Sequence, residues 1–156
     1  MSSGIPDFRS KEGLYNTLDC TKFNIPSAEL LFDYEFFKID PAPFYSFSKA
    51  LLVKKENLSP SPAHRFISLL QQKKKLLRNY TQNVDGIENS IGITKLIQCH
   101  GSMDTFKCIS TKCSRKKKLE DVTALVAEGS VCYCSCGDVL KPCITFFGEV
   151  CIVYSI

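Results

Sequence analysis

The middle of the chain alternates between short apolar runs and compact polar clusters. The apolar runs at residues 76–80 and 95–99 have the length of buried strands, and residues 86–90 between them are predicted to form a short helix. The polar clusters at 81–86 and 99–102 follow the two strands directly. Ligands of open α/β sheets bind at the carboxyl ends of the strands, so this strand–loop–helix–strand unit predicts a site at that edge.

Hydrophobic periodicity predicts helices before this unit. Apolar residues recur at helical spacing between Ala63 and Leu77, which predicts a helix from His64 to about Lys75 after a Ser/Pro linker at 59–62. Two further elements are expected earlier in an otherwise irregular, aromatic segment: a helical turn at 28–32 capped by Ser27, and a helix that begins at Asp40-Pro41 and runs to about Leu52.

Beyond residue 102 the pattern changes to short strands around cysteines. Residues 103–108 are predicted to form a strand, and residues 119–128 an amphipathic helix that Gly129 ends. Residues 139–149 are expected to return as a strand that runs into a glycine turn.

Charge and composition exclude several classes of protein. The chain has 156 residues, with 20 basic and 16 acidic side chains and a net charge of +4. Much of the excess comes from basic runs at 73–75 and 115–118, which are more often solvated faces than nucleic-acid sites, so no direct nucleic-acid site is predicted. The first residues lack the features of a signal peptide, and no apolar run is long enough to predict a membrane span.

The cysteines indicate a metal site. The chain has nine cysteines, and without a signal peptide they favour a metal or a reducing compartment over disulfides. Cys108 and Cys113 form one pair of metal ligands, and the second is either Cys134 with Cys136 or Cys132 with Cys136. Gly137 allows a tight turn and favours Cys134. Four thiolates suit a closed, structural zinc site. The other four cysteines are expected to be small buried residues: Cys20, Cys99, Cys143 and Cys151.

Some of these residues also have a simpler interpretation. Asn83, Asp85 and Gly86 would by themselves indicate only a turn, and the polar cluster that contains His100 is what favours a site. His64 begins a predicted helix beside its apolar stripe, so a structural role is predicted for it.

Taken together, the motifs resemble the sirtuin family of NAD-dependent protein-lysine deacylases, most closely its eukaryotic cytoplasmic and nuclear branch. The matching segments cover nearly all of residues 4–149: GIPDFRS at 4–10, GLY at 13–15, TQNVDGIE at 81–88, HGS at 100–102, the cysteine pairs, and KPCITFFGE at 141–149, which is similar to the family's RPdivFFGE.

The resemblance implies an α/β fold, with a partial Rossmann-type NAD-binding domain and a small helical plus zinc-ribbon module. It divides the chain into a mainly helical module (13–75), an NAD-binding core (76–102), a zinc module (103–142), and a return strand with an atypical tail (143–156). It further implies NAD and Zn²⁺ as cofactors, acetylated lysine-containing proteins as partners, no membrane association, and a cytoplasmic or nuclear location.

The same resemblance assigns roles to individual residues. His100 would be the general base that takes a proton from the ribose, for which an imidazole is suited at neutral pH. Asp7, Phe8 and Arg9 would belong to a loop that closes over NAD, and Ile5 would pack against the nicotinamide. The remaining expectations are that Gln82, Asn83 and Asp85 line the ribose and nicotinamide pocket, that Phe146, Phe147 and Gly148 border the acetyl-lysine tunnel, and that Cys108, Cys113, Cys134 and Cys136 bind zinc.

The chain departs from the family pattern at both ends. The family's glycine-rich phosphate-binding turn precedes the segment that matches GIPDFRS, and the apolar run at 150–156 does not resemble the polar turn that follows FFGE in the family. The sequence therefore resembles the middle of a sirtuin. We expect the chain by itself not to be a competent deacetylase. The alternatives are a catalytically inactive, zinc-bearing interaction module and a non-functional fragment.

Overall fold

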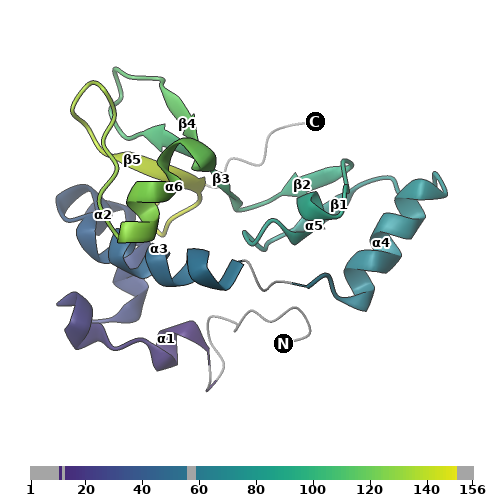
Figure 1. The fold of residues 1–156 in the computed structure, drawn as a ribbon, viewed down its shortest axis with the longest axis horizontal. Helices are drawn as coiled ribbons and strands as arrows, with labels where there is room; N and C mark the ends of the chain where they lie inside the picture. Colours follow the sequence, from purple (N-terminus) through teal and green to yellow (C-terminus); the bar gives the residue numbers. More distant parts are fainter. Residues whose placement is uncertain (1–10, 12, 56–58, 151–156) are drawn as a thin grey trace.

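The computed structural model describes residues 11, 13–55 and 59–150, and it has a mixed α/β architecture. Figure 1 shows two groups of elements: a small antiparallel sheet packed against several helices, and a parallel strand pair with two further helices. No helix in the described ranges is both long and apolar enough to cross a membrane. The predictions for Ile5, Asp7, Phe8, Arg9 and the tail at 151–156 lie outside these residues.

The strand–loop–helix–strand unit is present, but its first strand begins at Asn79 and not at residue 76, where it was expected. Strands β1 (Asn79–Thr81) and β2 (Leu96–Gln98) pair in parallel, and the short helix α5 (Ile87–Ser90) lies between them in sequence. Gly86 caps α5 with a φ of 75°. A parallel pair needs a crossover connection, and the loop with α5 supplies it.

Helix α4 (Pro62–Gln72) is bound to this unit through one side chain. The Gln71 amide nitrogen donates to the Gly92 carbonyl at 2.8 Å, and its amide oxygen accepts from the backbone N–H groups of Thr94 at 2.9 Å and Lys95 at 3.0 Å. These bonds fix the end of α4 against the turn that leads into β2.

The predicted bounds of α4 need a correction. The helix begins at Pro62 and ends at Gln72, so part of the expected linker belongs to its start and it stops short of Lys75. Ser61 is the N-cap, and its side chain and that of His64 form a capping box. The His64 ring Nδ1 accepts from the Ser61 backbone N–H at 3.2 Å, which is a structural role, as predicted.

The second sheet is antiparallel, in the order β4–β3–β5. Strand β3 (Gly101–Cys108) is the central strand; β5 (Leu140–Ile144) pairs along one side of it, and β4 (Lys116–Lys118) along the other. Strand β3 contains the predicted strand at 103–108 and begins two residues earlier, and β5 forms the first part of the predicted return segment at 139–149. The basic run that forms β4 was not predicted as a strand; all three of its lysines are exposed, as suits an edge strand.

Helix α6 (Leu119–Glu128) has the predicted bounds, and Gly129 ends it in the left-handed conformation with a φ of 78°. The helix that was expected from Pro41 is α3 (Ala42–Lys55), and the Asp40 carboxylate accepts from the Ala42 N–H at 3.1 Å. Both helices pack with the antiparallel sheet in Figure 1.

The segment between residues 13 and 39 contains more helix than predicted. It holds α1 (Leu14–Thr17), η1 (Cys20–Phe23), η2 (Ala28–Phe32) and α2 (Tyr34–Ile39). The turn at 28–32 is a 3₁₀ helix, and Ser27 makes no side-chain cap bond, so that expectation was wrong in detail. Asp33 caps α2 instead, since its carboxylate accepts from the Phe36 N–H at 2.8 Å.

An aromatic cluster joins these helices to the sheet. The rings of Phe37 and Phe44 lie 5.3 and 5.2 Å from the ring of Phe146, measured between centroids, and all three side chains are at most 2% exposed. The Tyr45 hydroxyl donates to the Leu140 carbonyl, which binds α3 to β5. Such aromatic contacts contribute beyond the area that they bury.

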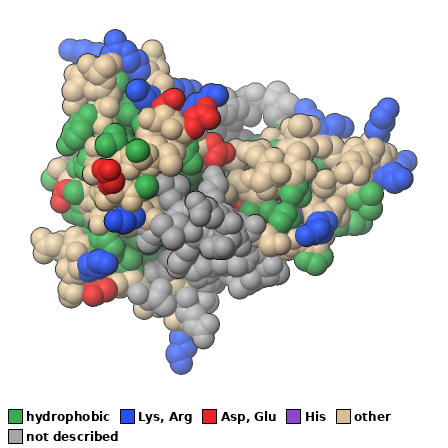
Figure 2. Space-filling model, in the orientation of Figure 1, with side chains coloured by type: hydrophobic (Ala, Val, Ile, Leu, Met, Phe, Trp, Pro, Cys, Tyr) green, Lys and Arg blue, Asp and Glu red, His purple; other side chains and the backbone are tan. Residues whose placement is uncertain are grey.

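Surface charge follows the basic runs of the sequence. Figure 2 shows lysine and arginine side chains gathered at the outer end of the antiparallel sheet, around β4, and again at the far end of α4. Lys73, Lys74 and Lys75, just after α4, and the three lysines of β4 are exposed. These positions agree with the expectation of solvated faces.

Gly101 lies where the chain permits no side chain. It has a φ of 78°, and a Cβ atom there would lie 1.9 Å from the Cys143 carbonyl oxygen. Gly92 has nearly the same φ, 76°, but an added Cβ would meet nothing within 4 Å. Alanine at Gly92 would therefore meet only backbone strain, whereas alanine at Gly101 would meet backbone strain and a steric clash.

We predict that Gly92→Ala lowers the free energy of unfolding by about 1 kcal/mol, the cost of a left-handed alanine. Gly101→Ala should cost at least about 2 kcal/mol more, because β3 and β5 must separate to admit the methyl group. Chemical denaturation of both variants measures the difference. Equal decreases in the free energy of unfolding for the two variants would show that β3 and β5 can move apart at Gly101 at little cost.

Candidate functional site

Two polar segments leave the parallel sheet at the same edge. Thr81 is opposite Gln98 in the β1–β2 register, and the Cys99 N–H donates to the Thr81 carbonyl at 2.8 Å. Gln82 and His100 follow these paired residues, so both segments start from the carboxyl ends of neighbouring parallel strands. This is the edge that the sequence pattern predicts for a ligand site.

The loop after β1 is held by its own turn bonds. The Asn83 N–H donates to the Thr81 hydroxyl at 3.2 Å, and one carboxylate oxygen of Asp85 accepts from the Ile87 N–H at 2.9 Å. The turn interpretation of this motif is therefore correct for the backbone. The side chains of Gln82 and Asn83 are exposed and that of Asp85 is half-buried, so their amide and carboxylate groups are accessible to a ligand.

Two buried polar atoms lie close to this edge in sequence. Within the described part of the chain, neither Oε2 of Glu88 nor Nε2 of Gln98 has a hydrogen-bond partner. Oε1 of Glu88 lies 4.0 Å from Nε2 of His64. Buried polar groups are normally satisfied, and with the amides and carboxylate of the loop they fit a ligand rich in amides and hydroxyls, as NAD is.

His100 is fixed between the two sheets. It comes directly before Gly101, the first residue of β3, and its carbonyl accepts from the Thr145 N–H at 2.9 Å. Because Gly101 is opposite Ile144 in the β3–β5 register, the loop at 145–149 leaves β5 beside His100. The structure thus brings the expected base and the expected acyl-lysine loop next to each other along the backbone.

The three residues predicted to border the acyl-lysine site have different surroundings. Phe146 is 2% exposed and belongs to the aromatic core. Phe147 is 48% exposed, and Gly148 is exposed with a φ of 86°. Phe147 is therefore the aromatic side chain of this loop that reaches the surface, and Phe146 supports the loop from inside.

The four predicted zinc ligands form one compact cluster. The sulfur atoms of Cys108, Cys113, Cys134 and Cys136 all lie within 4.8 Å of one another. The Cys108–Cys136 and Cys113–Cys134 sulfur distances are 3.5 and 3.8 Å. Sulfurs about 2.3 Å from a tetrahedral zinc lie about 3.8 Å apart, so the cluster fits zinc.

One of the two possible second pairs lies in the sulfur cluster. Cys134 is in the cluster, and Cys132 is 0% exposed in the core, with its thiol directed at the Ser130 carbonyl at 3.8 Å. The turn predicted at Gly137 is present, because the Gly137 N–H donates to the Cys134 carbonyl at 2.9 Å. Cys134 and Cys136, the favoured pair, are thus the pair in the cluster, and zinc binding by them stays a prediction.

The thiols of the cluster differ in acidity. Burial raises the pKa of Cys108, whereas the backbone N–H of Cys136 lowers the pKa of Cys134 to about 6. The exposed guanidinium of Arg115 donates to Cys134, and this interaction raises the pKa of Arg115. Four thiolates at this spacing repel one another unless a cation lies between them, which favours an ion such as zinc.

Sequence reasoning missed an ion pair beneath the loop at 145–149. Lys141 is 7% exposed, and its ammonium lies 2.8 Å from the Glu149 carboxylate. The available signal was a lysine inside a return strand, between Leu140 and Pro142, where a solvated side chain is not expected.

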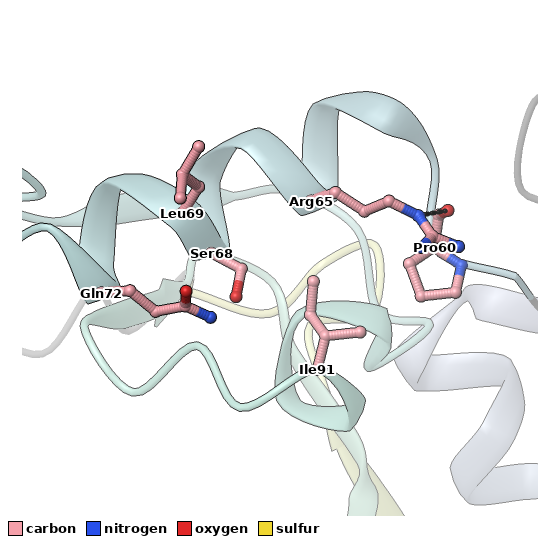
Figure 3. A pocket seen from close by; sticks show the side chains of 6 residues that line it. All are labelled: Pro60, Arg65, Ser68, Leu69, Gln72 and Ile91. Carbon is pink, nitrogen blue, oxygen red and sulfur yellow. Dashed lines mark hydrogen bonds between the residues drawn. The ribbon is translucent and has the colours of Figure 1, made fainter.

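A cavity of about 410 Å³ lies away from these groups. It lies between α4 and Ile91, as Figure 3 shows, and the Arg65 side chain extends toward Pro60, where its Nε donates to the Pro60 carbonyl at 3.3 Å. None of the predicted site residues lines this cavity.

Comparison with known proteins agrees with the resemblance to the sirtuin family. The model of the Sir2 family matches residues 1–154. The chain is 45% identical over 154 residues to NAD-dependent deacetylase sir2D of Dictyostelium discoideum. It is 41% identical over 150 residues to NAD-dependent protein deacetylase sir-2.1 of Caenorhabditis elegans, and 41% identical over 155 residues to NAD-dependent protein deacetylase sirtuin-1 of Homo sapiens.

Each of these matches covers 96% of this chain but a small part of the relative: 28% of the Dictyostelium protein, 24% of the nematode protein and 20% of the human protein. The chain thus spans about a quarter of the length of the relatives that it matches.

We predict that the purified chain holds about one equivalent of zinc, as a closed four-thiolate site does. Serine at any one of Cys108, Cys113, Cys134 or Cys136 should release the metal and lower the melting temperature, because one ligand is lost. Zinc content can be measured with a chromophoric chelator after denaturation.

Cys132→Ala is the matched control. It removes a fifth cysteine of the same segment and should leave the zinc content unchanged. Zinc loss in Cys132→Ala together with zinc retention in Cys134→Ser would contradict the assignment.

Proposed function

Since this chain belongs to the Sir2 family, we propose that it carries the nicotinamide-ribose end of the NAD site and the zinc centre of an NAD-dependent protein-lysine deacetylase. The observation that supports this most is the shared edge of β1 and β2. There, the loop that contains Asn83 and Asp85 and the segment that contains His100 leave neighbouring strands together.

In this proposal His100 is the general base. NAD, when bound, would supply a ribose carbon that the acetyl oxygen attacks while the bond from that carbon to nicotinamide breaks, so that nicotinamide is the leaving group. The His100 imidazole takes the proton from a ribose hydroxyl, and an imidazole can hold and release a proton near neutral pH. The contact between the His100 carbonyl and Thr145 N–H fixes the backbone from which the ring projects.

Gln82, Asn83 and Asp85 bind the nicotinamide and ribose. The Asp85 carboxylate has two oxygens: one accepts from the Ile87 N–H, and the other can accept from an amide N–H of the ligand. The expected contributions of Asp7, Phe8 and Arg9, as the loop that closes over NAD, and of Ile5, which would pack against the nicotinamide, belong to this half of the site.

Phe147 and Gly148 border the acyl-lysine. An aromatic wall accepts a neutral acetylated side chain and disfavours the charged amine of free lysine, because burial of a charge is costly.

The partners are therefore proteins that carry acetyl-lysine, either histone tails or cytoplasmic proteins, in the cytoplasm or nucleus. The division into residues 13–75, 76–102, 103–142 and 143–156 belongs to the same proposal.

The zinc site is structural in this scheme. Strand β3 has eight residues, and it separates His100 from Cys108 by roughly 26 Å at about 3.3 Å per residue. That distance is too long for the metal to touch the reacting atoms, and four thiolates leave no open coordination position.

We predict NAD-dependent deacetylation of an acetyl-lysine peptide when this chain replaces the matching segment of the Dictyostelium relative. His100→Ala should reduce turnover on the order of 10²–10⁴-fold, the usual contribution of a general base. Nicotinamide release, followed by chromatography, measures the reaction.

His64→Gln is the control, because His64 is the other of the two histidines and has a helix-capping role. Turnover without NAD, or turnover that His100→Ala leaves unchanged, would contradict the proposal. A folded, zinc-loaded chimera that binds no NAD would instead support the alternative function, a catalytically inactive, zinc-bearing interaction module.

A further inference from the structure

Lys141 has a buried ammonium group that neither the zinc cluster nor the NAD edge uses. Its nitrogen donates to the Ile144 carbonyl at 2.7 Å and to the Pro142 carbonyl at 3.2 Å, and it lies 2.8 Å from the Glu149 carboxylate. It also lies 4.1 Å from the centroid of the Phe146 ring. The Lys141 ammonium thus contacts Ile144 just before the loop at 145–149, the Phe146 ring within it, and Glu149 at its end.

Glu149 closes the loop from the other end. The same carboxylate oxygen that faces Lys141 accepts from the Phe146 N–H at 2.8 Å, and the Glu149 N–H donates to the Phe146 carbonyl at 3.1 Å. The ammonium and the carboxylate together fix the backbone on both sides of Phe147.

The helical side of the molecule fixes Phe147 itself. Its N–H donates to the Phe32 carbonyl at 2.7 Å, and its carbonyl accepts from the Tyr34 N–H at 3.0 Å. The main chain of Phe147 is therefore bound, while its ring remains 48% exposed. A fixed backbone with an exposed ring is the arrangement that a preorganised substrate contact requires.

The charge of Lys141, as well as its position, suits it to hold the loop at 145–149 in place. The ammonium has three donors, and three acceptors are present in the two carbonyls and the carboxylate. Removal of the cation would leave the partly buried Glu149 carboxylate without its counter-ion, and a buried charge without a partner is strongly disfavoured.

We propose that Lys141 is a positioning residue for the acyl-lysine site: through Glu149 and Phe146 it holds Phe147 and Gly148 in the orientation that receives the acylated side chain. This inference rests on the proposed function, and it adds a specific residue that acts on substrate without touching it.

The test compares Lys141→Met, which keeps the length and removes the charge, with Lys141→Arg, which keeps the charge. Lys107→Met is the matched control, because Lys107 is opposite Lys141 in the β3–β5 register and is exposed. For each variant of the full chain we would measure amide hydrogen exchange over residues 145–149, affinity for an acetyl-lysine peptide, and zinc content.

Lys141→Met should speed exchange in the loop and weaken peptide binding, each about tenfold, with zinc content unchanged. Lys141→Arg should restore both, and Lys107→Met should match the wild type. If Lys141→Met proves too unstable, Lys141→Met/Glu149→Gln removes both charges and should still show the faster exchange, because the cross-link is gone.

Unchanged loop exchange in Lys141→Met would overturn the inference. So would faster exchange with wild-type peptide affinity, since the pair would then be structural only. Failure of the wild-type chain to bind the peptide counts against the proposed function instead, and the exchange data would still report whether Lys141 holds the loop.

Discussion

The pairing of β3 with β5 is the interaction on which the rest of the structure depends. It runs from Gly101 opposite Ile144 to Cys108 opposite Leu140. At one end it places the loop at 145–149 beside His100, and at the other it leads into the cysteine cluster. One ladder therefore connects two groups of residues with different chemistry, a cluster of four cysteines that could hold a metal ion and a strand edge that could hold a ligand.

Much of this arrangement follows from local sequence signals. Helix α6 has the predicted bounds because an amphipathic repeat ends at Gly129, a glycine in the left-handed conformation. The cysteine spacing with Gly137 favoured the pair that lies in the cluster, since Gly137 allows the turn that brings Cys134 and Cys136 together. The parallel unit was evident from two apolar runs, each followed by a polar cluster. Each of these features is decided within a few residues.

Features that depend on distant partners were not predictable in the same way. Strand β4 is a run of lysines that pairs only because β3 offers an open edge. Phe146 and Phe147 are adjacent and chemically identical, and the aromatic core of the helices decides that the first is buried and the second exposed. The Lys141–Glu149 pair joins two residues whose proximity requires the loop to fold back on itself. Tertiary contacts made these choices, and single-sequence patterns do not contain them.

The position of the cysteine cluster also has a consequence for the order of folding. Cys108 and Cys136 are 28 residues apart in the chain; Cys108 ends β3, and Cys136 comes shortly before Leu140, the first residue of β5. Closing such a loop costs entropy before any strand contact can form. A metal ion that binds the thiolates early in folding would close the loop before the strands pair. Strand pairing would then proceed from the cysteine cluster toward His100. Zinc would then govern how fast the ligand-binding edge is assembled, as well as how stable it is afterwards.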